Sequence, residues 1–232
     1  MTQDLTTISA LSPLDGRYSG KLAALRPIMS EHGYMHKRVQ VEVTWFIALT
    51  EAGLAECPPL SAEATAYLRG LVQQFSEADT AAIKAIERET NHDVKAVEYW
   101  IKRAFQREAL SPSVREELAR AGEFVHFACT SEDINNLSHA LMLRDGIPVI
   151  THEMRGIITA IDALASQYSD LSMLSRTHGQ TASPTTLGKE MANVSARLRR
   201  QLAGVESITP LGKFNGAVGN FNAHLSAYPD IN

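Results

Sequence analysis

Two long rows of apolar residues at helical spacing dominate the second half of the sequence. Residues three or four positions apart lie on one face of an α-helix, so each row predicts one long amphipathic helix. Their near-heptad spacing is typical of long helices that pack side by side in a bundle. We therefore predict an all-α chain. The first row is Ile150, Met154, Ile157, Ile161, Leu164 and Tyr168, and the second is Leu187, Met191, Val194, Leu198, Leu202 and Val205.

Shorter apolar rows predict further helices in the first half of the chain. One row runs from Val39 to Ile47, and another lies at residues 94–107. Ser61 is a good N-cap for a helix between these two rows, because its hydroxyl can accept a bond from a free backbone N–H. Ser76 with Asp79 has the spacing of a capping box at the start of the next helix.

Proline and glycine mark where helices are expected to begin and end. Gly146 and Pro148 are predicted to close the helix that follows residue 131, and Ser183-Pro184 has the pattern of an N-cap followed by proline at the first helical position. No segment alternates with period two, which argues against a strand-rich fold. A domain boundary is placed soon after a Ser-Pro-Ser break. The predicted domains are a small N-terminal helical domain at residues 1–119 and the first part of a helical-bundle domain at residues 120–232.

Composition and charge argue against several classes of function. The chain has 26 acidic and 22 basic residues, a formal net charge of −4, whereas nucleic-acid binding needs clustered Lys and Arg. No apolar run approaches the roughly 20 residues that span a bilayer, so no membrane partner is predicted. The first residues do not have the pattern of a signal peptide. Cys57 and Cys129 are too few for a disulfide framework and fit a reducing cytoplasm.

The end of the sequence is glycine-rich and does not complete the bundle. Gly212, Gly216 and Gly219 lie in a segment that fits neither the P-loop nor the dinucleotide-binding pattern. The predicted long helices also have too few partners in this chain to cover their apolar faces. We expect more chain, more subunits or both to cover them.

Four polar clusters lie at loops or predicted helix starts. The first contains Arg17 and Tyr18, a forked cation and a hydroxyl suited to a phosphate or carboxylate. An ordinary turn with a solvated Arg is the alternative, and the cluster taken alone favours it. The second contains Asn91, His92 and Asp93 at a helix start, where free backbone N–H groups favour an anion. Here the alternative is that Asn91 or Asp93 only caps the helix.

The third cluster would present two hydroxyls, those of Thr130 and Ser131, at another helix start. Asp133 is placed to complete a capping box there. His126 and Cys129 have a spacing found in zinc sites, but no second Cys/His pair of suitable spacing accompanies them. We therefore predict no metal site.

The fourth cluster, Thr177 and His178, lies between the two long helices. An imidazole can give or take a proton near neutral pH, which suits a general acid or base. A solvent-facing loop histidine is an equally good interpretation. The sequence contains no Gly-x-Ser-x-Gly motif, so it does not indicate a serine hydrolase of that type.

Taken together, the clusters fall in five segments, Ser12–Tyr18, Thr90–Tyr99, Phe124–Asn136, Leu174–Gln180 and Gly212–Asn220. In order and approximate spacing, these segments resemble the bacterial form of adenylosuccinate lyase, a family of the aspartase/fumarase superfamily. The Asp-Gly-Arg-Tyr and Asn-His-Asp motifs point to this family rather than to argininosuccinate lyase, fumarase or aspartase.

The resemblance implies a cytoplasmic, largely α-helical enzyme with a long-helix bundle domain of the aspartase/fumarase type. Members form a homotetramer whose active sites are assembled from three subunits. They cleave adenylosuccinate to AMP and fumarate, and succinylaminoimidazole-carboxamide ribotide to the free carboxamide ribotide and fumarate, in purine biosynthesis. Neither reaction needs a redox cofactor or an essential metal, so the resemblance implies no cofactor.

Residue by residue, the resemblance makes His178 the general acid and places Arg17 and Tyr18 at the substrate phosphate. It also places Asn91, His92, Asp93, Thr130 and Ser131 against the substrate, and the hydroxyls, including that of Thr177, suit its carboxylates.

The family's catalytic base is a serine in the motif Ser-Ser-x-Met-Pro-x-Lys-x-Asn, which is absent from this sequence. We therefore expect a truncated, N-terminal portion of the enzyme that is inactive or nearly so by itself. The alternatives are a catalytically inactive helical interaction module and another fumarate-releasing lyase of the superfamily.

Overall fold

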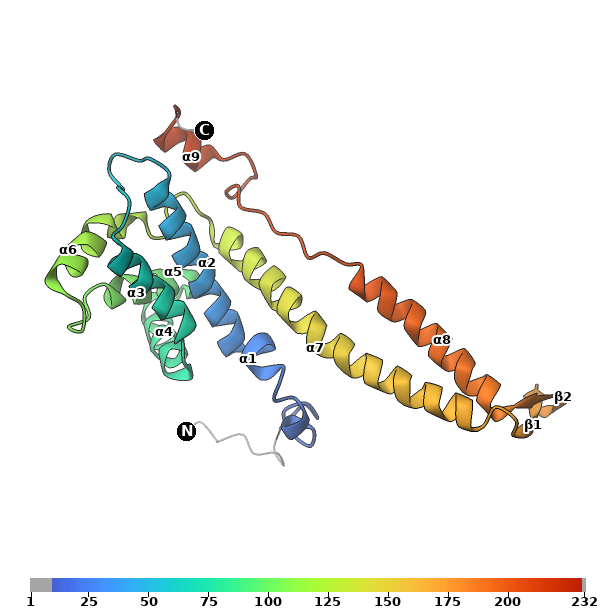
Figure 1. The fold of residues 1–232 in the computed structure, drawn as a ribbon. Helices are drawn as coiled ribbons and strands as arrows, with labels where there is room; N and C mark the ends of the chain where they lie inside the picture. The colour runs from blue at the N-terminus through green and yellow to red at the C-terminus, as the bar shows by residue number, and fades with distance from the viewer. Residues whose placement is uncertain (1–9, 231–232) are drawn as a thin grey trace. The chain divides into compact units, whose positions relative to one another are not determined.

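The computed structural model describes residues 10–230 and confirms the all-α class. No helix in this range is long and apolar enough to cross a membrane. The elements in chain order are η1 (Ser19–Lys21), α1 (Arg26–Met29), α2 (Glu31–Glu51), α3 (Ala62–Gln73), α4 (Glu77–Thr90), α5 (Asp93–Ala104), α6 (Pro112–Ala121), η2 (Gly122–Phe124), α7 (Ser131–Gln167), β1 (Ser172–Thr177), β2 (Gln180–Thr186), α8 (Leu187–Glu206) and α9 (Asn222–Ala227) (Figure 1).

Capping side chains fix two helix starts where the sequence predicted them. At the start of α3, Ser61 Oγ accepts a hydrogen bond from the Ala64 N–H at 3.1 Å. At the start of α4, Ser76 Oγ accepts from the Asp79 N–H and the Asp79 carboxylate accepts from the Ser76 N–H. These bonds satisfy N–H groups that have no partner inside their own helix. Both predicted caps are confirmed.

The described residues divide into two compact units. The first contains the residues up to Leu143 together with those from Leu211 onward, and the second contains Arg144–Pro210. This division crosses α7 and differs from the boundary predicted near residue 120. The domains at residues 1–119 and 120–232 stay a prediction.

The core of the first unit forms where α2 packs against α3, α4 and α5, and α6 packs against α3. Val39, Val43 and Phe46 on α2 are fully or almost fully buried, and the rings of Phe46 and Phe105 stack with centroids 5.5 Å apart. Removing these side chains from water drives the packing. A second cluster joins α2, α5 and α7 close to the starts of α5 and α7. Its buried members are Val41, Val94 and Ile134.

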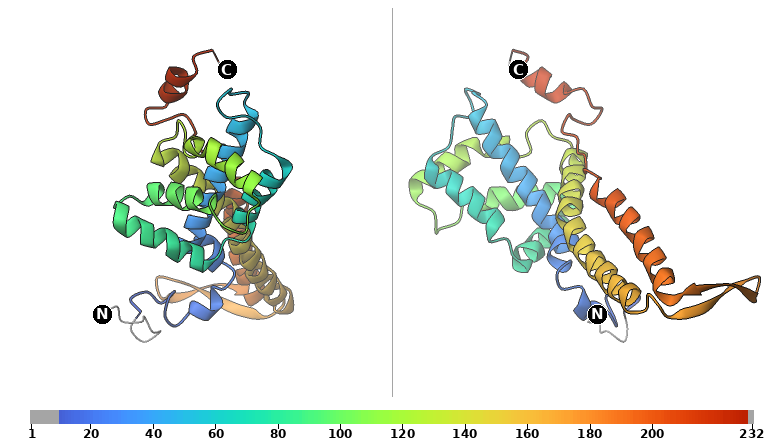
Figure 2. Two further views of the ribbon diagram at one scale, coloured as in Figure 1. Left: turned by 90° about the vertical axis from the view of Figure 1, so that its left-hand side faces the viewer. Right: turned by 45° about the vertical axis from the view of Figure 1, so that its right-hand side comes forward.

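In the second unit, the C-terminal part of α7 lies beside α8 (Figure 2). The Asp162 carboxylate on α7 accepts hydrogen bonds from the Ser195 hydroxyl and the Arg199 guanidinium on α8. The helices approach each other closely at Gly188, where a Cβ would lie 2.3 Å from the carbonyl oxygen of Ala165. Only glycine allows this approach.

A β-hairpin joins these two helices, and it corrects the prediction that a helix begins at Pro184. β1 and β2 pair antiparallel, and Thr186 at the end of β2 is the N-cap of α8. Most residues of both strands are exposed, so backbone pairing rather than burial of one face holds them. Because neither face of the hairpin is buried, the strands need no alternation of apolar and polar residues, and the sequence shows none. Pro184 pairs with Leu174 in a two-stranded ribbon, where each strand has a free edge.

α7 corrects a second prediction, because it continues through Gly146 and Pro148 to Gln167. Pro148 has no N–H, so the Arg144 carbonyl lacks its usual helical partner. A proline inside a helix can bend it without ending it. The division between the two units falls at Leu143 and Arg144, at this weakened turn.

Candidate functional site

Asn91, His92 and Asp93 form the junction between α4 and α5. Asn91 adopts a left-handed conformation with φ 52° and ends α4. His92 is the N-cap of α5, because its Nδ1 accepts a hydrogen bond from the Lys95 N–H at 3.2 Å. The cap is thus neither Asn91 nor Asp93. Since Nδ1 accepts this bond, Nε2 carries the ring proton, and the half-exposed imidazole can donate it to a ligand.

Arg38 on α2 connects the start of α5 to the start of α7. Its guanidinium donates to the Asp93 carboxylate, to Asn135 Oδ1 at 3.0 Å and to the Tyr34 hydroxyl at 3.0 Å. The Arg38 side chain is only 4% exposed, so these bonds lie largely out of water. Burial by itself would raise the pKa of Asp93, but the hydrogen bond and charge of Arg38 outweigh it and lower this pKa.

Asp133 connects the start of α7 to residues 213–216. Its Oδ2 accepts from the Thr130 N–H at 2.9 Å and the Gly216 N–H at 3.1 Å. Its Oδ1 accepts from Lys213 Nζ at 2.7 Å and the Asn215 N–H at 3.2 Å. Asp133 is fully buried, which by itself would raise its pKa, but these donors lower the pKa instead. The Asp133 bond to the Thr130 N–H is one half of the predicted capping box.

Thr130 borders a cavity of about 400 Å³ next to the glycine-rich segment. The hydroxyls of Thr130 and Ser131, both partly exposed, have no protein hydrogen-bond partner within residues 10–230. They can therefore donate to a ligand. The cavity is lined by Ala128, Cys129, Thr130, Gly216, Ala217, Val218, Asn220, Asn222 and Ala223.

Arg38 bonds to Asp93 of the second cluster and to Asn135 on α7, and Asp133 on the same helix bonds to Thr130 of the third cluster. The structure thus brings these two clusters into one part of the first unit. Arg17 and Tyr18 are not joined to them. Both are exposed, and the Arg17 guanidinium lies 5.5 Å from the Tyr18 ring centre. Within the described part of the chain, no hydrogen bond links this pair to the other candidate residues.

Thr177 and His178 belong to the second unit, where His178 is at the tip of the β-hairpin. His178 and Gly179 both have positive φ, 52° and 76°, as a two-residue type I′ turn requires. A positive φ is costly for a residue other than glycine, so the paired strands hold His178 in a strained conformation. Its imidazole is exposed to solvent.

Glu42 and His126 form a pair that sequence reasoning missed, in which Glu42 is buried and His126 is partly exposed. His126 Nδ1 lies 2.6 Å from Glu42 Oε1, and Glu42 is fully buried. Burial raises the pKa of Glu42 more than the His126 bond lowers it. Burial would lower the pKa of His126, but the Glu42 bond and charge outweigh it and raise this pKa. Helical spacing could have indicated that Glu42 is buried, because Arg38 and Glu42 lie on the same helix face as the buried Met35 and Val39.

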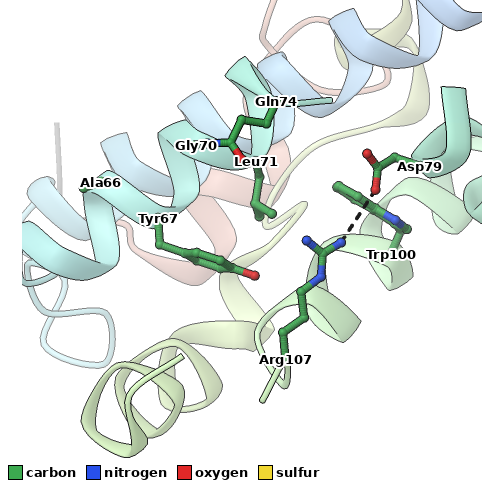
Figure 3. A pocket seen from close by; sticks show the side chains of 8 residues that line it. All are labelled: Ala66, Tyr67, Gly70, Leu71, Gln74, Asp79, Trp100 and Arg107. Atoms are coloured by element: carbon green, nitrogen blue, oxygen red, sulfur yellow. Dashed lines mark ion pairs between the residues drawn. The ribbon is translucent and has the colours of Figure 1, made fainter. Parts of the chain in front are cut away.

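A separate pocket of about 270 Å³ lies between α3, α4 and the end of α5 (Figure 3). Arg107 pairs with Asp79 at 3.7 Å, and its guanidinium lies 5.4 Å from the Trp100 ring centre. The Tyr67 hydroxyl donates to the Ala104 carbonyl at 2.7 Å. None of the candidate residues lines this pocket, and its charged groups pair with one another. We therefore do not place the candidate site there.

Sequence comparison identifies the family of the chain. A family model described as lyase matches residues 16–231. The chain belongs to this lyase family. Among curated proteins, the lyase chain is 57% identical over 231 residues to adenylosuccinate lyase of Haemophilus influenzae and 53% identical over 230 residues to adenylosuccinate lyase of Escherichia coli. Each match covers 98% of this chain and 49% of the relative, so the chain spans about half the length of the curated relatives it matches.

Solved structures with the same fold confirm its class. A fumarate lyase from Mesorhizobium has a TM-score of 0.68 at 23% identity, covering 86% of the lyase chain and 43% of the solved one. A β-carboxy-cis,cis-muconate cycloisomerase from Acinetobacter calcoaceticus has a TM-score of 0.69 at 20% identity, with 89% and 46% covered. At these identities the likeness concerns the fold alone.

Proposed function

We propose that the full-length protein containing this chain is a cytoplasmic adenylosuccinate lyase of purine biosynthesis. It releases fumarate from adenylosuccinate, giving AMP, and from succinylaminoimidazole-carboxamide ribotide. The observation that carries the proposal is the identity of 57% and 53% to two adenylosuccinate lyases along 98% of the chain. It is supported by two candidate clusters that Arg38 and Asp133 connect in the first unit.

The reaction breaks a C–N bond by elimination. A base removes a proton from the carbon beside a carboxylate, and an acid protonates the departing nitrogen. In this proposal His178 is the acid, the role that the family resemblance implies, and its exposed position at the tip of the hairpin leaves it able to approach a ligand. The carbanion formed between the two steps is stabilised as a doubly charged carboxylate, so donors must converge on it.

The substrate is strongly anionic, and most of the proposed contacts are donors or cations; the carboxylate of Asp93 is the exception, and it is paired with Arg38. Thr130 and Ser131, with Thr177, offer hydroxyls to the succinyl carboxylates, while the Nε2–H of His92 offers a further donor. Asn91 and Asp93 complete the contact segment at the start of α5, where backbone N–H groups favour an anion. Arg17 and Tyr18 take the phosphate.

We propose further that the 232-residue chain is inactive by itself, because no serine motif of the Ser-Ser-x-Met-Pro type is present to supply the base. The full-length protein is proposed to be a homotetramer. In support, α7 and the turn after it expose large apolar side chains at intervals of seven residues. These are Leu143, Ile150, Ile157, Leu164 and Leu171, each 41% to 51% exposed. A heptad row is the pattern by which long helices pack against partner helices.

The test is an assay of fumarate release by the full-length protein with adenylosuccinate, argininosuccinate and aspartate as separate substrates. Of these three compounds, we expect fumarate release from adenylosuccinate alone. His178→Ala should lower kcat by about 10²–10⁴-fold with a much smaller change in KM, because it removes a general acid. Release from one of the other substrates would favour a different lyase. Absence of both turnover and AMP binding in the full-length protein would favour an interaction module instead.

A further inference from the structure

The glycine-rich segment is held against α7 by side chains on its first two turns. The Asn136 amide pairs with both backbone groups of Lys213, because Oδ1 accepts the N–H at 2.7 Å and Nδ2 donates to the carbonyl at 3.0 Å. One residue earlier, Gly212 lies so close to α7 that a Cβ would meet Leu137 Cδ2 at 2.4 Å. The segment is thus fixed to α7 by its backbone, about 80 residues away in sequence.

The Lys213 side chain adds a charge to this attachment. Its Nζ donates to Asp133 Oδ1 and to the Gly216 carbonyl, both at 2.7 Å. With the N–H groups of Thr130, Asn215 and Gly216, it fills the roughly four acceptor positions of the Asp133 carboxylate. A fully buried carboxylate is tolerated only when it is paired and hydrogen-bonded in this way.

A single oxygen of Asp133 therefore sets the position of two segments. Oδ2 accepts from both Thr130 and Gly216, and these residues line the same cavity of about 400 Å³. Gly216 has φ 84°, and a short turn leads from it to Asn220 on the cavity wall. A shift of the Asp133 carboxylate would move the Thr130 hydroxyl and this wall relative to each other.

We propose that Asp133 and Lys213 are a positioning pair that holds Thr130 and the wall at residues 216–220 in the arrangement the substrate requires. Neither residue has to touch the substrate for this role. The inference rests on the proposed function and adds a part of the chain to which that function assigns no role.

The experiment compares four variants of the full-length protein. Lys213→Met and Lys213→Gln remove the charge of a partly exposed side chain while Asp133 keeps its three backbone donors. Lys213→Arg restores the charge. Glu132→Gln is the matched control, because it removes an exposed carboxylate from the same helical turn.

Two readouts are measured on each variant that folds and keeps the oligomeric mass of the wild type. In the lyase assay, Lys213→Met and Lys213→Gln should lower kcat by about 10–100-fold, a cost typical of misplaced contacts, with little change in KM. Lys213→Arg should recover most of kcat, and Glu132→Gln should match the wild type. In hydrogen exchange, the Thr130 and Gly216 amides should exchange about tenfold faster in the Met and Gln variants only.

Wild-type kcat and exchange in Lys213→Met or Lys213→Gln would overturn the positioning pair. So would an arginine variant as impaired as the methionine variant, or failure of both uncharged variants to fold, since the pair would then serve stability alone. If the wild type released no fumarate from adenylosuccinate, the proposed function would fail instead. Hydrogen exchange would still decide whether the pair holds the two segments.

Discussion

The close contact at Gly188 gives a prediction whose size follows from the structure. A Cβ at this position would lie 2.3 Å from the Ala165 carbonyl oxygen and 2.7 Å from Ser169 Cα. A carbon in contact with a carbonyl oxygen normally stays about 3.3 Å or more away, so Gly188→Ala must separate the helices by about 1 Å. All of the close atoms belong to the backbone and cannot rotate aside.

The expected cost of Gly188→Ala combines three contributions. Overpacking of this kind costs about 1–3 kcal/mol. The hydrogen bonds from the Leu187 N–H to the Leu171 carbonyl (2.9 Å) and from the Gly188 N–H to the Tyr168 carbonyl (2.8 Å) would stretch, at about 0.5–1.5 kcal/mol each if lost. The better helix preference of alanine returns about 0.5–1 kcal/mol. We expect a loss of about 2–4 kcal/mol in the free energy of unfolding.

Gly204→Ala is the matched control in the same helix. No atom lies within 4 Å of the point that a Cβ would occupy there, so this substitution should stabilise the protein by about 0.5–1 kcal/mol. Urea unfolding of the full-length protein, followed by circular dichroism at constant oligomeric mass, measures both changes. Changes of the same sign in the two variants would refute the reasoning, because the close approach would then have no energetic weight.

Three further predictions concern the first unit. Asp93→Asn should lower the free energy of unfolding by about 2–4 kcal/mol, because it leaves the almost fully buried Arg38 cation without its carboxylate. Arg38→Met should cost less, because water can replace Arg38 around the half-exposed Asp93. Because the two side chains bond to each other, the double variant should lose less free energy of unfolding than the sum of the two single losses, and an additive loss would contradict this pairing. The raised pKa of His126 adds stability at low pH that is lost as the pH rises through the folded-state pKa of His126. The raised pKa of Glu42 acts in the same direction, and its contribution is lost as the pH rises from the ordinary Glu value through the folded-state pKa of Glu42. Unfolding at about pH 6 and 8 should show this slope, and Glu42→Gln should reduce it. Arg17→Ala should raise KM for adenylosuccinate with little change in kcat, and an unchanged KM would favour the solvated turn.

The caps at Ser61 and Ser76 could be predicted because a capping bond joins residues three apart in the sequence. The β-hairpin could not, because its strands are exposed and carry no apolar alternation. The continuation of α7 through Pro148 was also hidden, since proline favours a helix end locally and the rest of a long helix can outweigh that preference. Each error comes from a local signal that the surrounding structure overrides.

The candidate site divides in the same way. Side chains that suit an anionic substrate, such as His92 and Thr130, could be chosen from their chemistry at helix starts. Arg38 and Lys213 could not, because their partners lie about 55 to 97 residues away in the chain.

The sequence by itself determined the helical class and the capped helix starts, because these depend on spacing and side-chain chemistry within a few residues. The residues proposed to serve a lyase stay a prediction from the same local chemistry. Only the tertiary structure decided which partner each buried ionisable group meets: Arg38 meets Asp93, Glu42 meets His126, and Asp133 meets Lys213. The physical reason is that a charged side chain can be buried only where an opposite charge or a hydrogen-bond partner is present. That partner is supplied by the packing of distant segments.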